Sequence, residues 1–297
     1  MKIFIAEPTG ISVETYREAL GDHEIHELDT RGMSDAELIT AIGDAEILVL
    51  TNRPVSAGVI EALPGLKMIS VAFAGIDHLD AKAIVQREIK VNNAAGYANT
   101  AVAELVFGYM LALSRRLLEN AQQIHQGVGT NTGHELKGKT LGIVGYGAIG
   151  QEVARLAEAF GMEPLIYSRS GSASLETLFR SSDFISLHLP LNESTRHLIG
   201  AELFSVMKPS ACLINAARGP IIKEADLIHA LRNKQLSAAA IDVFDMEPPL
   251  PADYPLLQEA NVLATPHIGF NTAEALKTKG ELALRNVVQF IQECSSR

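Results

Sequence analysis

Short apolar runs alternate with amphipathic segments along the first 98 residues of the chain. The apolar runs are typical of buried strands, and segments with apolar residues at helical spacing are typical of amphipathic helices. This alternation predicts a parallel, doubly wound sheet whose ligand-facing loops follow the carboxyl ends of the strands. The predicted strands are residues 2–6, 26–28, 47–50, 68–72 and 91–93, and the predicted helices are residues 13–20, 34–42, 56–63 and 81–87.

A long helical stretch follows, from about Thr100 through Leu118 or as far as Gln126. Its apolar stripe suits a helix that crosses between domains and equally a plain core helix. The strand and helix alternation then restarts, which predicts a nucleotide-binding sheet. Its strands are expected at residues 141–144, 164–167, 184–189, 212–216, 238–243 and 262–265. A last helix from an N-cap at Thr272 to Cys294 is expected to pack on the first domain.

The pattern as a whole predicts an α/β protein with two doubly wound parallel-sheet domains and a cleft between them. A flavodoxin-like, substrate-binding domain is expected over residues 1–98 plus 271–297, and a Rossmann, dinucleotide-binding domain over residues 99–270. The loops at residues 51–54 and 73–77 follow predicted strands of the first domain, so they are expected to face the cleft.

Composition narrows the class of protein. The 297 residues are 47% hydrophobic and 20% charged, which suits two globular domains with sizeable cores. The net charge of -10 argues against nucleic acid and anionic membranes as partners. The apolar run at residues 2–6 is too short for a signal peptide or a membrane span. Cys212 and Cys294 lack metal-ligand spacing, so no metal is expected, and free thiols indicate a cytoplasmic protein.

A glycine-rich turn follows the apolar strand that ends at Val144. Gly145 allows the tight turn, Gly147 lets the backbone approach a pyrophosphate, and Gly150 lets the next helix pack close to the strand. The first N–H groups of that helix would meet the anion. The turn therefore predicts a dinucleotide site that includes Gly145, Gly147, Ala148, Ile149 and Gly150.

The end of the next predicted strand bears on the choice of cofactor. About 20 residues beyond the glycines, where an NAD enzyme places a carboxylate for the ribose, this chain has Ser168. A carboxylate there would repel a 2′-phosphate, whereas a hydroxyl followed by the Arg169 guanidinium can donate to it. Ser168, Arg169 and Ser170 therefore predict NADP rather than NAD, with NAD as the alternative. The competing interpretation is that Arg169 is an ordinary solvated loop charge.

Three polar residues follow predicted strands of the second domain and are candidates for chemistry: Arg218, Glu247 and His267. The Arg218 fork can hold a carboxylate in two parallel bonds and withdraw electron density from an adjacent carbonyl. A carboxylate such as Glu247, beside His267, would orient the imidazole and stabilise its protonated form, as general acid-base catalysis requires. Taken singly, each residue would also suit a surface charge, a turn or a loop.

Over nearly its whole length the chain resembles the D-isomer-specific 2-hydroxyacid dehydrogenases. The segments that carry the resemblance are residues 75–80, 102–104, 138–145, 188–191, 215–219, 242–244, 247–248 and 265–269. The resemblance implies hydride transfer between a nicotinamide cofactor and a small D-2-hydroxy or 2-keto acid. It also implies a homodimer formed through the cofactor domain, partly by the long helix from Thr100.

The same resemblance implies roles for individual residues. Arg218 would bind the substrate carboxylate and carbonyl, His267 would be the general acid and base, and Glu247 its partner. Backbone N–H groups near Ala74 and Gly75 would bind the substrate carboxylate. Asp242 would contact the nicotinamide amide. The further cofactor contacts that the resemblance implies are Thr100, His188, Leu189, Pro190, Thr195, Ala216 and Gly269.

Within the family, residues 51–54 and 96–97 are similar to the glycerate dehydrogenase and hydroxypyruvate reductase branch. Arg53 is a candidate for binding a second polar group of the substrate, and a surface loop arginine is the alternative. Phe73 and Tyr97 either shape the side-chain pocket or are packed hinge residues.

Three other interpretations stay open at the level of sequence. A formate-type dehydrogenase would have Gln rather than Glu247 beside the histidine. A cofactor-sensing regulator, similar to the corepressors that share this fold, would need a partner-binding surface or appended tails. An NADP-binding protein without activity is disfavoured by the intact set of Arg218, Glu247 and His267.

Overall fold

The structure, a computed structural model, describes residues 1–297 except 169–170, 172–173, 247–248 and 297. It divides into two compact units, Met1–Ala98 with Asn271–Arg297, and Asn99–Phe270. Each unit contains a sheet in which every paired strand runs parallel to its neighbour. The predicted class of two α/β, parallel-sheet domains is therefore confirmed.

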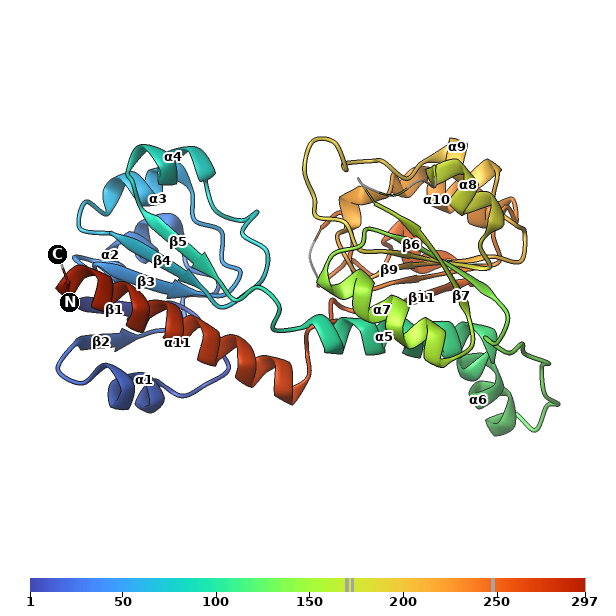
Figure 1. Ribbon diagram of the computed structural model, residues 1–297, viewed down its shortest axis with the longest axis horizontal. Coiled ribbons are helices and arrows are strands. Elements are labelled where there is room, and N and C mark those ends of the chain that lie inside the picture. Colours follow the sequence, from blue (N-terminus) through green and yellow to red (C-terminus); the bar gives the residue numbers. More distant parts are fainter. Residues whose placement is uncertain (169–170, 172–173, 247–248, 297) are drawn as a thin grey trace. The chain divides into compact units, whose positions relative to one another are not determined.

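The first unit is a five-stranded sheet of order β2-β1-β3-β4-β5 with helices on both faces (Figure 1). Its elements are β1 (Lys2–Ile5), α1 (Val13–Leu20), β2 (Glu24–Glu27), α2 (Asp35–Ile42), β3 (Ile47–Leu50), α3 (Ala57–Ala62), β4 (Met68–Val71), α4 (Ala81–Gln86), β5 (Lys90–Asn93) and α11 (Ala273–Ser295). The two strands β3 and β4 are buried along their whole length, which is why they are continuous apolar runs in the sequence.

Helix α11 belongs to the first unit although it comes last in the chain. It begins after Thr272, whose hydroxyl oxygen accepts a hydrogen bond from the Ala275 N–H at 3.2 Å, as the sequence predicts. Its buried side chains Ala283 and Val287 share a core with strand residues of β1, β3 and β4. The Ser70 hydroxyl of β4 donates to the Ala283 carbonyl at 3.0 Å. The last helix thus packs on the sheet of the first unit.

The second unit is a six-stranded sheet of order β11-β10-β9-β8-β6-β7. Its elements are α5 (Asn99–Ser114), α6 (Leu117–His125), β6 (Thr140–Val144), α7 (Ala148–Ala159), β7 (Glu163–Tyr167), α8 (Leu175–Ser181), β8 (Phe184–Leu187), α9 (Ala201–Ser205), β9 (Cys212–Asn215), α10 (Glu224–Arg232), β10 (Ala238–Ile241) and β11 (Val262–Ala264). In Figure 1, α5 and α7 lie on one face of this sheet, and α8, α9 and α10 lie on the other.

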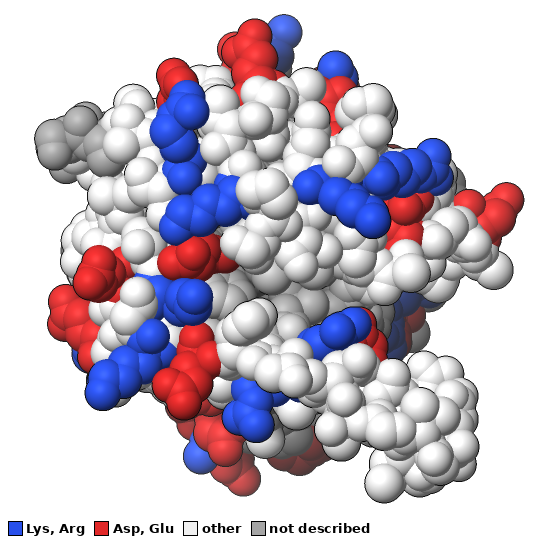
Figure 2. Space-filling model, turned by 90° about the vertical axis from the view of Figure 1, so that its right-hand side faces the viewer, with Lys and Arg blue, Asp and Glu red and all other residues white. Residues whose placement is uncertain are grey.

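The long helix predicted from Thr100 is broken in two. Arg116 adopts a left-handed conformation, with φ of 50°, and this separates α5 from α6. Helix α6 then carries exposed apolar side chains, Leu117, Leu118 and Ile124. Figure 2 shows this side of the second unit, where acidic and basic side chains are intermingled. The projection at the lower right, at the height of α6 in Figure 1, is almost wholly uncharged. In the part of the chain that the structure describes, no helix has the length and apolarity to cross a membrane.

Candidate active site

The predicted cofactor and catalytic positions of the second unit follow the carboxyl ends of its strands. Gly145 follows β6, His188 follows β8, Ala216 follows β9, Asp242 follows β10, and His267 is the third residue after β11. Because carboxyl ends of parallel strands lie at the same edge of a sheet, these positions form one row in the strand order β11-β10-β9-β8-β6.

The glycine turn leaves no room for a side chain at two of its positions. Gly145 has φ of 103°, and a Cβ there would lie 2.5 Å from the His188 carbonyl oxygen. A Cβ on Gly150 would lie 2.1 Å from the Gly145 carbonyl oxygen. The turn between β6 and α7 is therefore as tight as the sequence predicts, and α7 begins close to the strand.

Gly147 differs from its neighbours, because a Cβ there would meet nothing within 4 Å. It is the N-cap of α7 and has no side chain to accept hydrogen bonds from the first N–H groups of the helix. Those N–H groups and the positive end of the helix dipole suit an anion. The open space beside Gly147 fits the pyrophosphate of a dinucleotide.

We expect Gly147→Ala to weaken NADPH and NADH binding by roughly tenfold or more without lowering the Tm. The added methyl clashes with nothing in the chain, but it takes the space into which a pyrophosphate would enter. Cofactor fluorescence titration and thermal unfolding measure the two quantities. Gly108→Ala, on α5, also adds a methyl that meets nothing within 4 Å and should leave cofactor affinity intact. Unchanged affinity in Gly147→Ala would place the pyrophosphate elsewhere.

Ser168 lies beside the glycine turn. Val144 of β6 is in register with Tyr167 of β7, and the Gly145 N–H donates to the Tyr167 carbonyl at 2.9 Å. Ser168 is the residue after Tyr167, and its carbonyl accepts a hydrogen bond from the Gly171 N–H at 3.0 Å. The other two residues of the NADP prediction, Arg169 and Ser170, lie outside the described residues.

The loop after β8 is held by its own side chains. The His188 N–H donates to the Val144 carbonyl at 2.7 Å, and its Nε2 is 2.9 Å from the Ser186 hydroxyl. Desolvation lowers the pKa of His188 to about 4, so the ring is neutral near pH 7. The Thr195 hydroxyl donates to the Pro190 carbonyl at 2.7 Å, which closes the loop containing the predicted cofactor contacts.

Arg218 is presented on a turn that a buried asparagine holds. Asn215 is fully buried at the end of β9, and its side-chain amide donates to the Arg218 carbonyl at 3.0 Å. The Asn215 side-chain oxygen accepts from the Ala217 N–H at 3.1 Å. The next residue must be glycine, because a Cβ on Gly219 would lie 1.9 Å from the Phe244 carbonyl oxygen. The Arg218 guanidinium donates to the Ala217 carbonyl at 2.8 Å.

His267 lies on a loop organised by Asp242. The carboxylate of Asp242 is fully buried and accepts hydrogen bonds from the N–H groups of Ile268 at 2.8 Å and Gly269 at 2.7 Å. The His267 N–H donates to the Asp242 carbonyl at 2.8 Å. His267 has φ of 55°, a left-handed conformation that costs a non-glycine residue on the order of 1–3 kcal/mol. The bonds to Asp242 hold that conformation in place.

The pairing of His267 with Glu247 falls outside the described residues, since Glu247 is not among them. The His267 ring packs edge-on against the Phe270 ring, with centroids 5.4 Å apart. The structure thus describes two of the three predicted catalytic residues, Arg218 and His267. They follow β9 and β11, the strands on either side of β10.

In the first unit, the side chain of Arg53 turns toward its own domain. Its guanidinium donates to the carbonyls of Thr30 and of Met33, the latter at 2.7 Å. Its backbone N–H donates to the carboxylate of the buried Glu7 at 3.0 Å. These contacts hold the 51–53 loop and disfavour an ordinary surface charge, while binding of the substrate by Arg53 stays a prediction.

The other predicted residues of this unit lie after β4. Ala74 is exposed and its carbonyl accepts from the Asn93 side chain at 2.7 Å, while Gly75 is half-buried. Phe73 and Tyr97 are both buried, with ring centroids 6.0 Å apart. Their mutual packing suits the hinge interpretation and leaves the pocket interpretation untested.

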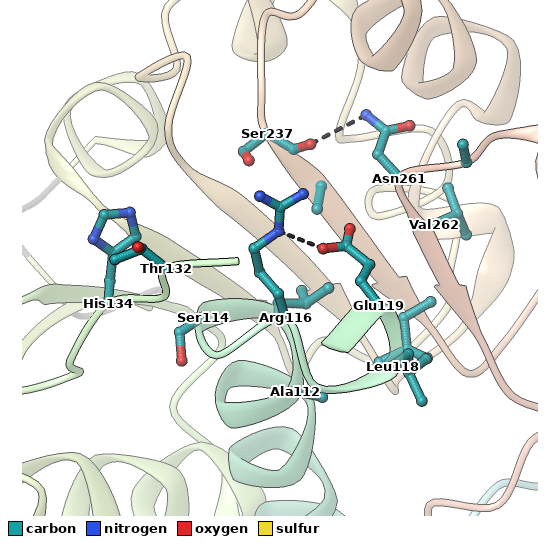
Figure 3. A pocket seen from close by; sticks show the side chains of 14 residues that line it. Ala112, Ser114, Arg116, Leu118, Glu119, Thr132, His134, Ser237, Asn261 and Val262 are labelled. Atoms are coloured by element: carbon teal, nitrogen blue, oxygen red, sulfur yellow. Dashed lines mark hydrogen bonds and ion pairs between the residues drawn. The ribbon is translucent and has the colours of Figure 1, made fainter. Parts of the chain in front are cut away.

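A cavity of about 440 Å³ lies at the opposite edge of the second sheet, at the amino ends of β10 and β11 (Figure 3). There the Asn261 side chain donates to the Ser237 carbonyl at 3.1 Å. Facing them in Figure 3, Arg116 and Glu119 form an ion pair. Since His267 and Arg218 follow carboxyl ends of strands, this cavity is separate from the predicted site.

Among the described residues, no group of three or more His, Cys, Asp or Glu side chains could hold a metal ion.

Sequence reasoning did not single out Asn215, Thr265 or Tyr109, although each is bonded to the site. The Asn215 amide holds the arginine turn. The Tyr109 hydroxyl bonds the Thr265 hydroxyl, which in turn bonds Asp242. For Asn215 a signal existed, because it is a polar residue inside an apolar strand pattern. For Tyr109, on a helix far away in sequence, we find no such signal.

Several known proteins are similar to this chain in sequence or in fold. Over residues 107–269 the chain matches the family model described as D-isomer specific 2-hydroxyacid dehydrogenase, NAD binding domain. It is 40% identical to a hydroxypyruvate reductase of Thermotoga maritima, over 89% of this chain and 90% of that relative. It is 36% identical to a D-3-phosphoglycerate dehydrogenase of Methanocaldococcus jannaschii, over 98% of this chain but 58% of that longer relative. A solved acyclic imino acid reductase, Bsp5, in complex with NADPH and D-Arg, has a TM-score of 0.88 and 28% identity, with coverage of 99% of this chain and 98% of that one.

Proposed function

This chain belongs to the D-isomer-specific 2-hydroxyacid dehydrogenase family, and on that basis we propose that it interconverts a small 2-keto acid and the D-2-hydroxy acid. The observation that carries the proposal is one sheet edge with a dinucleotide turn after β6, Arg218 after β9 and His267 after β11. The similarity to a hydroxypyruvate reductase favours a substrate of the size of hydroxypyruvate or glyoxylate. Relatives named as reductases and dehydrogenases favour an enzyme over a cofactor-sensing corepressor.

Different residues of this chain are proposed to bind the substrate, to transfer the proton and to stabilise the negative charge. A bound nicotinamide supplies the hydride for reduction and accepts it in oxidation. The protonated imidazole of His267 donates its proton to the substrate carbonyl oxygen, and in oxidation takes it from the hydroxyl. The Arg218 guanidinium binds the substrate carboxylate and stabilises negative charge on the carbonyl oxygen. Glu247 is proposed to orient His267, and backbone N–H groups near Ala74 and Gly75 to bind the substrate carboxylate.

The proposed activity is tested by following NADPH and NADH oxidation with glyoxylate, hydroxypyruvate, pyruvate and a bulkier 2-keto acid. Turnover with the smaller acids and the D configuration of the product would support the proposal. The ranking of the acids reports the size of the substrate pocket. Binding of either cofactor without turnover of any acid would contradict it and favour the sensor alternative.

We propose NADP as the preferred cofactor. Ser168 follows β7 next to the glycine turn, at the position where a carboxylate would select NAD. The solved relative with NADPH shows that this fold accommodates that cofactor in another protein.

We expect Ser168→Asp combined with Arg169→Ala to shift the ratio of kcat/KM toward NADH by roughly tenfold or more, because a carboxylate repels the 2′-phosphate. Arg180→Ala, which breaks an exposed ion pair on α8, is the matched control. An unchanged ratio would show that the 2′-phosphate is bound elsewhere.

We also propose that the chain is a homodimer formed through the second unit. Leu118 and Ile124 of α6 are 62% and 72% exposed, and exposed large apolar side chains on one helix favour burial against a second copy. Sedimentation velocity measures the mass directly. A monomer at micromolar concentration would contradict the proposal.

The compartment proposed for this protein is the cytoplasm. Cys212 is buried and Cys294 is exposed, and both are free thiols in the structure. Unpaired cysteines are typical of reducing compartments. Fractionation with a compartment marker tests this.

A further inference from the structure

A chain of hydrogen bonds joins α5 to the carboxylate beneath the His267 loop. The Tyr109 hydroxyl bonds the Thr265 hydroxyl, and the Thr265 hydroxyl lies 2.5 Å from Asp242 Oδ1. A carboxylate can only accept, so Thr265 donates to Asp242 and therefore accepts from Tyr109. Both hydrogen bonds therefore have a fixed donor: Tyr109 donates to Thr265, and Thr265 donates to Asp242.

Asp242 connects these hydrogen bonds to the loop that contains His267. Its Oδ1 also accepts from the Ile268 N–H, and its Oδ2 accepts from the Gly269 N–H. Its carbonyl accepts from the His267 N–H. The residues on both sides of His267 are thus tied to one buried side chain, and a rotation of that carboxylate would move the loop. A hydrogen bond from Thr265 opposes that rotation.

The hydroxyl of Tyr109 can be removed by mutation without changing how its ring packs. Tyr109 is buried in the core on the α5 face of the sheet, together with Val106, Met110 and Ile143. A phenylalanine would fill the same apolar space and lose only the hydroxyl. Desolvation raises the pKa of Tyr109 above its ordinary value, so the hydroxyl keeps its proton and remains a donor.

We propose that Tyr109 and Thr265 are positioning residues, which hold the Asp242 carboxylate and the His267 loop in the orientation that nicotinamide binding and proton transfer require. The inference rests on the proposed function and on the contact of Asp242 with the nicotinamide amide that the family resemblance implies. Neither side chain is assigned contact with substrate. Each acts through Asp242.

The kinetic test uses Tyr109→Phe, Thr265→Val, Thr265→Ser and the double variant Tyr109→Phe with Thr265→Val. We expect about fivefold lower kcat in Tyr109→Phe and about tenfold lower kcat in Thr265→Val, with the KM for the keto acid within about twofold. Thr265→Ser keeps the hydroxyl and should restore kcat to within about twofold of wild type. The double variant should be no slower than Thr265→Val alone, because Tyr109 acts through Thr265. Tyr16→Phe, a fully buried tyrosine of the first unit, is the matched control.

A binding test without turnover separates this inference from the proposed activity. NADPH contains nicotinamide, whereas 2′-phospho-ADP-ribose contains the same nucleotide portion without it. We expect Tyr109→Phe and Thr265→Val to weaken NADPH binding by about threefold or more relative to 2′-phospho-ADP-ribose binding. If wild type turns over no keto acid, the proposed function fails, and this ratio still tests the positioning of Asp242.

Several outcomes would overturn the inference. Equal weakening of both nucleotides, or of neither, would show that the network does not act on the nicotinamide position. Multiplicative effects in the double variant would show that Tyr109 and Thr265 act independently. Loss of activity that follows a lowered Tm, and that Tyr16→Phe reproduces, would assign the hydroxyls a role in stability alone.

Discussion

Replacing His267 by alanine is expected to lower kcat by roughly 10²- to 10⁴-fold while leaving the Kd for the cofactor nearly unchanged. The imidazole is the group proposed to transfer the proton at the carbonyl oxygen, and no such transfer is available from a methyl group. The glycine turn proposed to bind the pyrophosphate follows β6, a different strand of the sheet from β11. Steady-state kinetics gives kcat, and fluorescence titration gives the Kd.

The backbone of His267 requires a second variant. At φ of 55° an alanine is strained, so His267→Ala alone could distort the loop. Asparagine tolerates the left-handed region, and His267→Asn should lower kcat to the same extent without disturbing the loop. His229→Ala, an exposed histidine on α10, should keep full activity. Weakened cofactor binding with normal kcat in both His267 variants would refute the assignment of the general acid and base.

The second large effect is expected at Arg218. Arg218→Lys should lower kcat/KM for a 2-keto acid by roughly 10²-fold or more, although the positive charge is kept. An ammonium group cannot reproduce two parallel bonds to a carboxylate, and it donates from a different position. Cofactor Kd should change little, so the loss separates substrate binding from cofactor binding.

Arg232→Lys is the matched control, because Arg232 forms a surface ion pair with Glu259 on the same unit. It should keep wild-type kcat/KM, since lysine keeps the positive charge of the pair and Arg232 is not among the predicted site residues. Full activity of Arg218→Lys would show that the carboxylate is held by other groups. If both arginine variants lost kcat/KM equally, the cause would be a general loss of stability on replacing arginine by lysine. A lowered Tm in thermal unfolding would reveal it.

The order of strands and helices could be predicted from the sequence because each buried parallel strand is a short apolar run. Strands such as Ile47–Leu50 and Met68–Val71 are buried on both faces, so their pattern is unambiguous. The glycine turn was equally visible, since Gly145 and Gly150 are places where a Cβ would collide with backbone. These features are local, and local sequence determines them.

Features that depend on contacts between distant residues could not be predicted in the same way. The break at Arg116 requires a left-handed backbone at a residue whose side chain carries no signal for it. The bond between Tyr109 and Thr265 spans 156 positions in sequence. The inward turn of Arg53 depends on carbonyls of the loop around Thr30 and Met33. Such contacts arise from tertiary packing, which residue spacing does not encode.

The late position of α11 in the chain has a consequence for how the protein is made. Synthesis at roughly 5–20 residues per second delivers the five strands of the first unit long before the helix that covers them. Until Ala283 and Val287 leave the ribosome, the sheet face around Ile3, Val49 and Met68 lacks that cover. The second unit is continuous in sequence and can complete its core first. During translation the sheet of the first unit therefore has an uncovered apolar face, which is the kind of surface that chaperones bind.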